Sequence, residues 1–202
     1  MREGMFNPIM LCSRYVTMLD EIDNDALERQ INNRALMKEP YYPSGVHSMD
    51  TAPGEEFSHD ANGLPMSGES RKLVDLIHKV IDEEIVEGFR TYACWVHLVG
   101  ANEQTSLHSH SVYHEQNPHL SWVYYVKTPP DCGNLSFDTT IHTRHIWMEE
   151  ESVAGKLVVF PWWIPHGTTK NNSGDMRISI SGNCTGEFTD PKNLYNIIGL
   201  TD

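Results

Sequence analysis

The sequence lacks several features that define common classes of protein. Its 202 residues include four cysteines, Cys12, Cys94, Cys132 and Cys184, and no two of them form a C-x-x-C pair. The sequence therefore predicts neither a zinc knuckle nor a disulfide framework, and it favours a reducing, intracellular setting. No apolar run approaches the length of a membrane span or a signal-peptide core, so we expect a soluble, cytoplasmic protein. Internal repeats, glycine-rich phosphate or dinucleotide motifs and a Ser-His-Asp order are also absent.

Basic residues are scarce as well. The chain has 15 Lys and Arg against 28 Asp and Glu, which gives a formal net charge of −13 and a pI near 5.2. Such a protein repels phosphate backbones and anionic lipid, so we expect it to bind neither duplex nucleic acid nor a membrane. A small cofactor or substrate is favoured instead.

Apolar and aromatic residues are plentiful. Hydrophobic residues make up 39% of the chain, including five Trp and eight Tyr, so a disordered chain is excluded. A length of 202 residues suits one domain with a substantial core. We expect residues 1–88 to form a helical support with a long loop and residues 89–190 to form a β-sheet core.

The first half of the chain predicts two helices. Residues 8–19 can form a strand, and the apolar spacing within Asp23–Lys38 predicts a helix that Pro40 would end. The stretch from Glu39 to Gly68 is rich in Pro, Gly, Ser and Asp and predicts a long loop, a candidate lid or substrate wall. A second amphipathic helix is expected over Ser70–Glu87, with its apolar stripe packed on a sheet.

After Gly88 the pattern becomes that of short strands separated by turns. Aromatic and β-branched residues concentrate in the candidate strands 91–99, 105–110, 120–128, 134–138, 143–149, 156–161 and 176–183. Two helices followed by seven or eight short strands predict a mainly β protein with helical support. The fold class is a double-stranded β-helix, that is, a jelly roll or cupin-like fold, with the N-terminal helices packed on one sheet.

Three histidines and an arginine carry the strongest chemical signal. His108 and His110 stand at positions i and i+2 at the end of a candidate strand, where alternation places both side chains on one face. Two imidazoles so placed can bind one metal ion. His166 follows a later strand and Arg177 begins the next one, an order that a closed double-sheet barrel would bring together. This combination predicts a reaction centre with His166 as a metal ligand and Arg177 as an anion clamp.

The motifs of the second half resemble those of the iron(II) and 2-oxoglutarate-dependent oxygenase superfamily, most closely its small microbial and phage members. The resemblance covers about residues 91–183 and keeps the family's order. The segments that carry it are Trp95, His108-Ser-His110, Leu120–Val126 with the proline turn after it, Gly133–Asp138, Gly155–Pro161, Pro165-His166 and Arg177-Ile-Ser179.

The resemblance implies Fe(II) and 2-oxoglutarate as cofactors. It implies that His108 and His166 bind the iron and that Arg177 binds the far carboxylate of 2-oxoglutarate. A guanidinium suits that task because its planar fork meets a carboxylate with two parallel hydrogen bonds.

Two further side chains are candidate cofactor contacts. Ser179 faces the same side as Arg177, and its hydroxyl could add a donor. Tyr125 or Tyr124 could reach the cofactor from a neighbouring strand, since buried tyrosine hydroxyls seek partners. The register of that strand decides between the two.

The third metal ligand departs from the family's pattern. The superfamily usually has Asp or Glu two positions after the first His, where this sequence has His110. A neutral imidazole there leaves the metal centre one unit more positive. We take His110 as the third ligand and keep Glu115 with His114, or Asp138, as alternatives.

The resemblance implies a dioxygenase that hydroxylates a small molecule or a protein side chain with release of succinate and CO2. Three protein ligands leave three positions on the iron, two for the oxo acid and one for molecular oxygen. The protein then has to hold the substrate close and exclude water. Candidate walls are the loop 39–68, the segment 111–119, Trp162 and Trp163, although core packing is the simpler reading of the tryptophans.

Two other classes remain open. One is a cupin-like metal enzyme that uses three histidines without 2-oxoglutarate, in which Arg177 would have no role. The other is a non-catalytic jelly-roll binding module whose histidines bind nothing. Among the remaining histidines, His97 is interpreted as a satisfied interior residue and His78 as structural.

Overall fold

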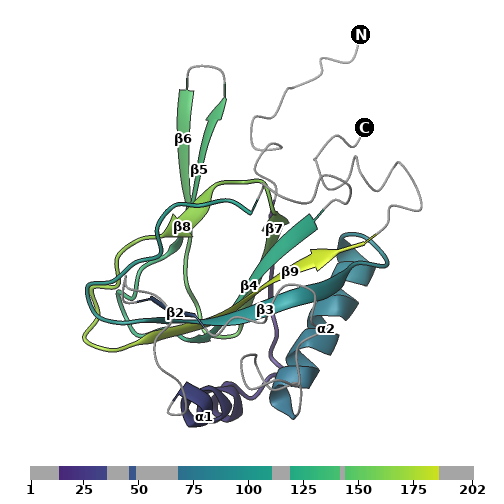
Figure 1. The fold of residues 1–202 in the computed structure, drawn as a ribbon, viewed down its shortest axis with the longest axis horizontal. Coiled ribbons are helices and arrows are strands. Elements are labelled where there is room, and N and C mark those ends of the chain that lie inside the picture. Colours follow the sequence, from purple (N-terminus) through teal and green to yellow (C-terminus); the bar gives the residue numbers. More distant parts are fainter. Residues whose placement is uncertain (1–13, 36–45, 49–67, 111–118, 142–143, 187–202) are drawn as a thin grey trace.

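A computed structural model describes residues 14–35, 46–48, 68–110, 119–141 and 144–186 (Figure 1). Nine strands and two helices lie within these residues. The strands are β1 Tyr15–Met18, β2 Val46–Ser48, β3 Arg90–Val99, β4 His119–Lys127, β5 Leu135–Ile141, β6 Arg144–Glu150, β7 Lys156–Pro161, β8 His166–Thr168 and β9 Arg177–Thr185. The helices are α1 Asn24–Ala35 and α2 Glu69–Glu84.

The strands form two antiparallel sheets. The larger sheet has six strands in the order β1-β7-β4-β9-β3-β2, and the smaller has three in the order β6-β5-β8. The order interleaves strands that are distant in sequence, as a jelly roll requires. The predicted fold class, a mainly β double-stranded β-helix with helices on one sheet, is confirmed. Both helices lie on the larger sheet, on the face away from β5, β6 and β8 (Figure 1).

The two helices follow the predicted pattern with small shifts at their ends. The N–H of Ala26 donates to Asp23 Oδ1 at 3.0 Å, so Asp23 caps the start of α1. Helix α2 ends at Glu84, before the predicted Glu87. The Asp82 carboxylate accepts the N–H of Gly88 at 2.8 Å, and Gly88 has a φ of +89°, so the chain has already turned toward β3.

Three short segments differ from the predicted strands. The strand β2 lies inside the predicted loop 39–68, and β8 begins at His166, where no strand was predicted. The segment 105–110 is not a strand and makes one isolated bridge, between His108 and His166. Three-residue strands contain too few side chains to show alternation, so the sequence cannot reveal them. Whether such a segment forms a strand depends on the strand with which it pairs.

The larger sheet is buried on both faces. Its side toward the helices carries Trp122 and Tyr124 of β4, which pack with the apolar stripe of α2, Leu73, Val74, Ile77 and Ile81. The other side of β4 carries Val123 and Tyr125, which pack with residues of the smaller sheet such as Leu135 and Phe137. Alternate residues of one strand therefore serve two different cores.

Two sequence expectations bear on the chain as a whole. Cys94, Cys132 and Cys184 are buried free thiols, and Cys12 lies outside the described residues. No helix in the described part of the chain combines the length and apolar character that a membrane span requires.

Truncating the stripe of α2 should destabilise the fold. Ile77 is 0% exposed, so Ile77→Ala should leave a cavity between helix and sheet and lower the free energy of unfolding by about 2–5 kcal/mol. Lys79→Ala, on the exposed side of the same helix, is the matched control and should change it by less than about 0.5 kcal/mol. Chemical denaturation measures both, and equal effects would contradict the packing described above.

Candidate functional site

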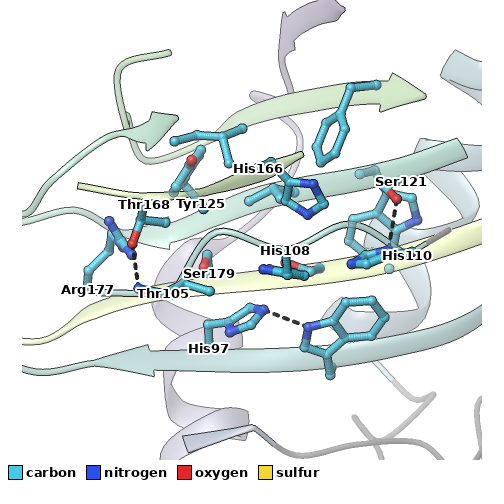
Figure 2. Close-up of a pocket in the computed structure, with 18 residues that line it drawn as sticks. His97, Thr105, His108, His110, Ser121, Tyr125, His166, Thr168, Arg177 and Ser179 are labelled. Carbon is cyan, nitrogen blue, oxygen red and sulfur yellow. Dashed lines mark hydrogen bonds between the residues drawn. The ribbon is translucent and has the colours of Figure 1, made fainter. Parts of the chain in front are cut away.

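A pocket lies between the two sheets, on the face of the larger sheet opposite the helices (Figure 2). Its lining combines aromatic and aliphatic side chains with an unusual number of polar ones. The polar side chains are His97, Thr105, His108, His110, Ser121, Tyr125, His166, Thr168, Arg177, Ser179 and Ser181. Most of the residues that the sequence singled out therefore meet in one place.

Strand β9 supplies one polar row of this pocket. Arg177, Ser179 and Ser181 line it, whereas Ile178 and Ile180 between them pack under the helices. The alternation of polar and apolar residues would ordinarily indicate a strand with one face in water. Here β9 is central and its first eight residues are buried, so the polar face looks into a pocket between the sheets.

Three imidazoles converge at one end of the pocket. One ring nitrogen from each of His108, His110 and His166 lies within 4.8 Å of the other two. The ring centroids are 5.3 Å apart for His108 and His110, 4.5 Å for His108 and His166, and 5.0 Å for His110 and His166. Among the described residues, this is the one group of three His, Cys, Asp or Glu with ligand-like spacing.

Backbone pairing holds two of these histidines together. The N–H of His108 donates to the carbonyl of His166 at 2.8 Å, and the N–H of His166 donates back at 2.8 Å. Gly167 permits this approach, because a Cβ there would lie 2.9 Å from the Thr105 carbonyl oxygen and 3.1 Å from Leu107 N. Close contact between a short loop and β8, rather than a strand over 105–110, places His108.

Hydrogen bonds also fix the ring tautomers of His108 and His166. The Nδ1 of His108 lies 2.8 Å from the Ser106 carbonyl oxygen, and the Nδ1 of His166 lies 2.8 Å from the Ile164 carbonyl oxygen. A carbonyl only accepts, so each Nδ1 carries the proton. Each Nε2 is then left with a free lone pair, the form in which imidazole binds a metal.

The third imidazole is held by side chains instead of backbone. The Nδ1 of His110 lies 2.8 Å from Oδ1 of Asn183 on β9. The same Oδ1 accepts the hydroxyl of Ser121 on β4 at 2.8 Å. Because Asn183 and Ser121 sit on paired central strands, the His110 ring is oriented by the rigid part of the sheet and also presents Nε2.

Burial favours the neutral form of two of these imidazoles, those of His110 and His166. Desolvation lowers the pKa of His166 to about 3, and a positive charge on His108 would lower it further. Burial also lowers the pKa of His110, against the opposing hydrogen bond to Asn183. Neutral imidazoles near pH 7 are competent ligands.

The other end of the pocket holds a buried guanidinium. Arg177 is 1% exposed, and its Nη1 donates to the carbonyls of Cys132 and Gly133 at 3.1 and 3.2 Å. Its Nε is buried without a hydrogen-bond partner, and no carboxylate of the described residues forms an ion pair with it. Burial lowers the pKa of Arg177, but a guanidinium stays charged. The pocket therefore contains a cation that requires an anion.

The register of β4 separates the two candidate tyrosines. Tyr125 lines the pocket, and its hydroxyl has no well-formed hydrogen bond among the described residues. Burial raises the pKa of Tyr125 to about 12, against opposing effects of Ser152 and Arg177. Tyr124 points to the helix side instead, where its hydroxyl donates to Asn24 Oδ1 at 2.8 Å.

Sequence reasoning underrated His97. It lines the pocket, its Nε2 accepts the indole N–H of Trp95 at 2.6 Å, and its buried Nδ1 has no partner among the described residues. The interpretation of His97 as a satisfied interior histidine is thus wrong for one of its two nitrogens. Alternation from Trp95, which carried the resemblance and also lines the pocket, could have indicated that His97 shares its face.

Of the alternative third ligands, the described residues include Asp138 alone. The Asp138 carboxylate on β5 pairs with His145 on β6, and Asp138 is not in the group of three imidazoles. Glu115 and His114 lie outside the described residues, as do most of the two candidate wall segments, 39–68 and 111–119.

Other residues considered from the sequence have structural surroundings. His78 accepts the N–H of Thr91 at 3.0 Å, which agrees with its interpretation as structural. Trp163 packs against the core between the sheets, which is the simpler of the two readings given to it. Neither Trp162 nor Trp163 is among the side chains that line the pocket.

Comparisons with known proteins identify the fold. No family model and no curated protein matches the sequence. Among solved structures, the chain is similar to a Pseudomonas putida prolyl-4-hydroxylase, with a TM-score of 0.63 and 17% identity over 89% of this chain and 95% of that one. It is also similar to SnoK, a non-haem α-ketoglutarate-dependent carbocyclase of nogalamycin biosynthesis, with a TM-score of 0.68 and 13% identity over 88% and 81%.

A third similar structure is HygX from Streptomyces hygroscopicus with nickel and 2-oxoglutarate bound. Its TM-score is 0.60, at 12% identity over 89% of this chain and 85% of that one. These alignments span nearly the whole chain, so the resemblance read from the sequence is confirmed at the level of the fold.

Gly167→Ala should weaken metal binding without touching a ligand. The added Cβ would push the 105–107 backbone away from β8 and separate His108 from His166. We expect the affinity for Zn(II) or Mn(II), measured by chelator competition, to fall roughly 10–100-fold, as it does when supporting contacts of metal ligands are lost. Gly174→Ala is the control, because a Cβ there meets nothing within 4 Å. Unchanged affinity in both variants would refute the role of this close approach.

The metal-free protein should lose stability in mild acid. The folded-state pKa of His166, about 3, is below its unfolded value of 6.5, so between these values only the unfolded chain takes up the proton. The contribution of neutral His166 to the free energy of unfolding is therefore present above pH 6.5. It falls by roughly 2 kcal/mol between pH 7 and pH 5. Urea unfolding with a chelator at both pH values measures it. His166→Gln should show a smaller difference, and an equal one would exclude this cause.

Proposed function

We propose that this protein is a non-haem Fe(II)- and 2-oxoglutarate-dependent dioxygenase that hydroxylates its substrate with release of succinate and CO2. One observation carries the proposal. A cluster of three metal-competent imidazoles and a buried guanidinium without a counter-ion among the described residues share one pocket. A 2-oxo dicarboxylic acid has chelating oxygens at one end and a carboxylate at the other, so it matches both ends of the pocket.

The residues present fit a divalent metal. His108, His110 and His166 each offer one ring nitrogen, and three protein ligands leave further positions on a metal ion for other ligands. Imidazole suits iron, zinc, copper and nickel. A set of three histidines contributes no negative charge, so the metal keeps its full charge of +2.

The residues at the other end fit the far carboxylate. Arg177 Nε and the Tyr125 hydroxyl are buried donors that have no well-formed partner within the described residues. An unmet buried donor costs about 1–3 kcal/mol, and more when it is charged. A carboxylate that accepts from both would remove that cost, and it would neutralise the guanidinium.

When bound, Fe(II) and 2-oxoglutarate supply the activation of molecular oxygen. The protein's own groups hold, orient and shield. The three Nε2 atoms hold the metal, and the guanidinium of Arg177 fixes the direction in which the oxo acid lies. Val123, Leu135 and Phe160 form apolar walls of the pocket and limit the access of water to it.

The proposed substrate is a small molecule or a protein side chain. Prolyl hydroxylation and carbocyclisation, named for two of the similar structures, are examples of the range that this fold supports. A net charge of −13 argues against duplex nucleic acid. The free thiols Cys94, Cys132 and Cys184 agree with a cytoplasmic location.

A second candidate function is a cupin-like metal enzyme that does not use 2-oxoglutarate. No carboxylate of the described residues belongs to the three-histidine cluster, which favours this alternative. Such an enzyme would leave Arg177 buried without an anion, so Arg177 favours the oxygenase. A third candidate is a non-catalytic binding module whose histidines bind nothing. Metal bound to the protein after anaerobic purification would exclude this candidate, and its absence would favour it.

Anaerobic titration with Fe(II) and 2-oxoglutarate tests the proposal. The wild type should develop a visible charge-transfer band and should form succinate slowly in air without substrate. Arg177→Ala should keep metal binding but lose about 2–5 kcal/mol of 2-oxoglutarate binding, which is roughly 30-fold or more in affinity. Arg90→Ala is the control, because Arg90 pairs with Asp82 outside the pocket. A wild type that gives neither band nor succinate would exclude the oxygenase function.

The choice of third ligand has its own test. His110→Ala and His166→Ala should each lower metal affinity by at least roughly 100-fold and abolish the band, because a three-ligand site loses one of its anchors. His145→Ala and Asp138→Asn change a pair outside the cluster and should leave affinity and band unchanged. If Asp138→Asn abolished the band and His110→Ala did not, Asp138 would be the third ligand.

A further inference from the structure

His97 presents a hydrogen-bond donor that has no acceptor among the described residues. The indole N–H of Trp95 donates to Nε2 of His97 at 2.6 Å. Because an indole N–H only donates, this Nε2 carries no proton, and the neutral ring must carry its proton on Nδ1. That Nδ1 is buried and has no partner among the described residues. Trp95 therefore fixes the tautomer in which His97 offers an N–H to the pocket.

The sheet register places His97 between the two ends of the pocket. His97 pairs with Ser179 of β9, and Ser179 pairs on its other side with Tyr125 of β4. Arg177 lies two residues before Ser179, at the start of β9, which is about 7 Å away along the strand. In the opposite direction, four residues from Ser179, Asn183 holds the His110 ring. A ligand that reaches from the metal cluster to the guanidinium passes over the row formed by His97, Ser179 and Tyr125 (Figure 2).

Three buried donors on or beside this row lack a well-formed partner: Nδ1 of His97, the hydroxyl of Tyr125 and Nε of Arg177. Three such donors in the lining of one pocket are unusual, because most buried polar side-chain atoms in proteins are paired. One carboxylate has about four lone-pair sites and can accept from all three.

We propose that His97 is a binding residue for the oxo acid, donating Nδ1–H to the same distal carboxylate that Arg177 and Tyr125 contact, and that Trp95 positions it. The inference rests on the proposed function and deepens it. A subsite with these three buried donors would select oxo acids with a second carboxylate over those with an apolar tail.

A pair of substitutions separates this role from a structural one. The amide nitrogen of asparagine can occupy the position of Nδ1, whereas that of glutamine reaches the position of Nε2. His97→Asn thus keeps a donor toward the carboxylate and loses the acceptor for Trp95. His97→Gln keeps a group beside Trp95 and loses the donor toward the carboxylate.

We would measure 2-oxoglutarate affinity by anaerobic calorimetry on the Mn(II)-loaded full-length protein. His97→Gln should weaken binding roughly 10–100-fold, the effect of a hydrogen bond to a charged group, and His97→Asn should stay within about threefold of the wild type. Binding of 2-oxovalerate, which lacks the distal carboxylate, should be equally weak in the wild type and in both variants. Mn(II) affinity and the melting temperature, measured on the same samples, identify a variant that has lost the metal site or the fold.

The opposite ranking, with His97→Asn impaired and His97→Gln normal, would overturn the inference and leave His97 as a structural partner of Trp95. Equal 2-oxoglutarate affinity in all three proteins would also overturn it. Both outcomes leave the proposed function standing, because the wild type still binds the oxo acid. A wild type that binds Mn(II) but no 2-oxoglutarate would instead refute the proposed function, and the inference with it.

Discussion

A buried positive charge is the constraint on which the rest of the site depends. Arg177 is almost wholly removed from water, and among the described residues it has no carboxylate partner. Two carbonyls of the turn before β5, those of Cys132 and Gly133, hold one end of its fork. Backbone dipoles alone repay only part of the desolvation of a charge. An anion bound to Arg177 would recover the stability that the fold gives up here, and ligand binding would then be coupled to the stability of the pocket.

The three-histidine cluster depends on a different feature, the close approach of two backbone segments. The loop before His108 lies directly against Gly167, and the bridge between His108 and His166 fixes their relative position. His110 is held from the sheet, by the Asn183 amide. In all three rings Nδ1 is hydrogen-bonded to an oxygen atom. These hydrogen bonds set both the orientation of each ring and its tautomer. A site of this kind is organised before a metal arrives.

Electrostatics link the two ends of the pocket. The protein as a whole carries a charge of −13, yet the pocket contains a guanidinium and, with a divalent metal, a further +2 that no carboxylate of the three-histidine cluster reduces. An oxo diacid brings two negative charges and leaves an excess of one positive charge. A carboxylate in place of one of the three histidines would cancel this excess positive charge. Because the three-histidine cluster has no carboxylate among the described residues, this pocket favours anionic ligands more strongly than a cluster with one carboxylate would.

Local pattern alone predicted the main strands and helices and the polar alternation of β9, because each depends on neighbours in sequence. The roles of His166 and Arg177 stay predictions, which came from the order of the motifs and from the family resemblance. The tertiary structure decided the features that depend on how the strands pair, namely which way a side chain points and which partners it meets. It directed Tyr125 into the pocket and Tyr124 toward the helices, and it paired Asp138 with a histidine of β6. It also left one nitrogen of His97 without a partner in the described part of the chain. Alternation predicts that two residues share a face; only contacts between distant segments decide what that face meets.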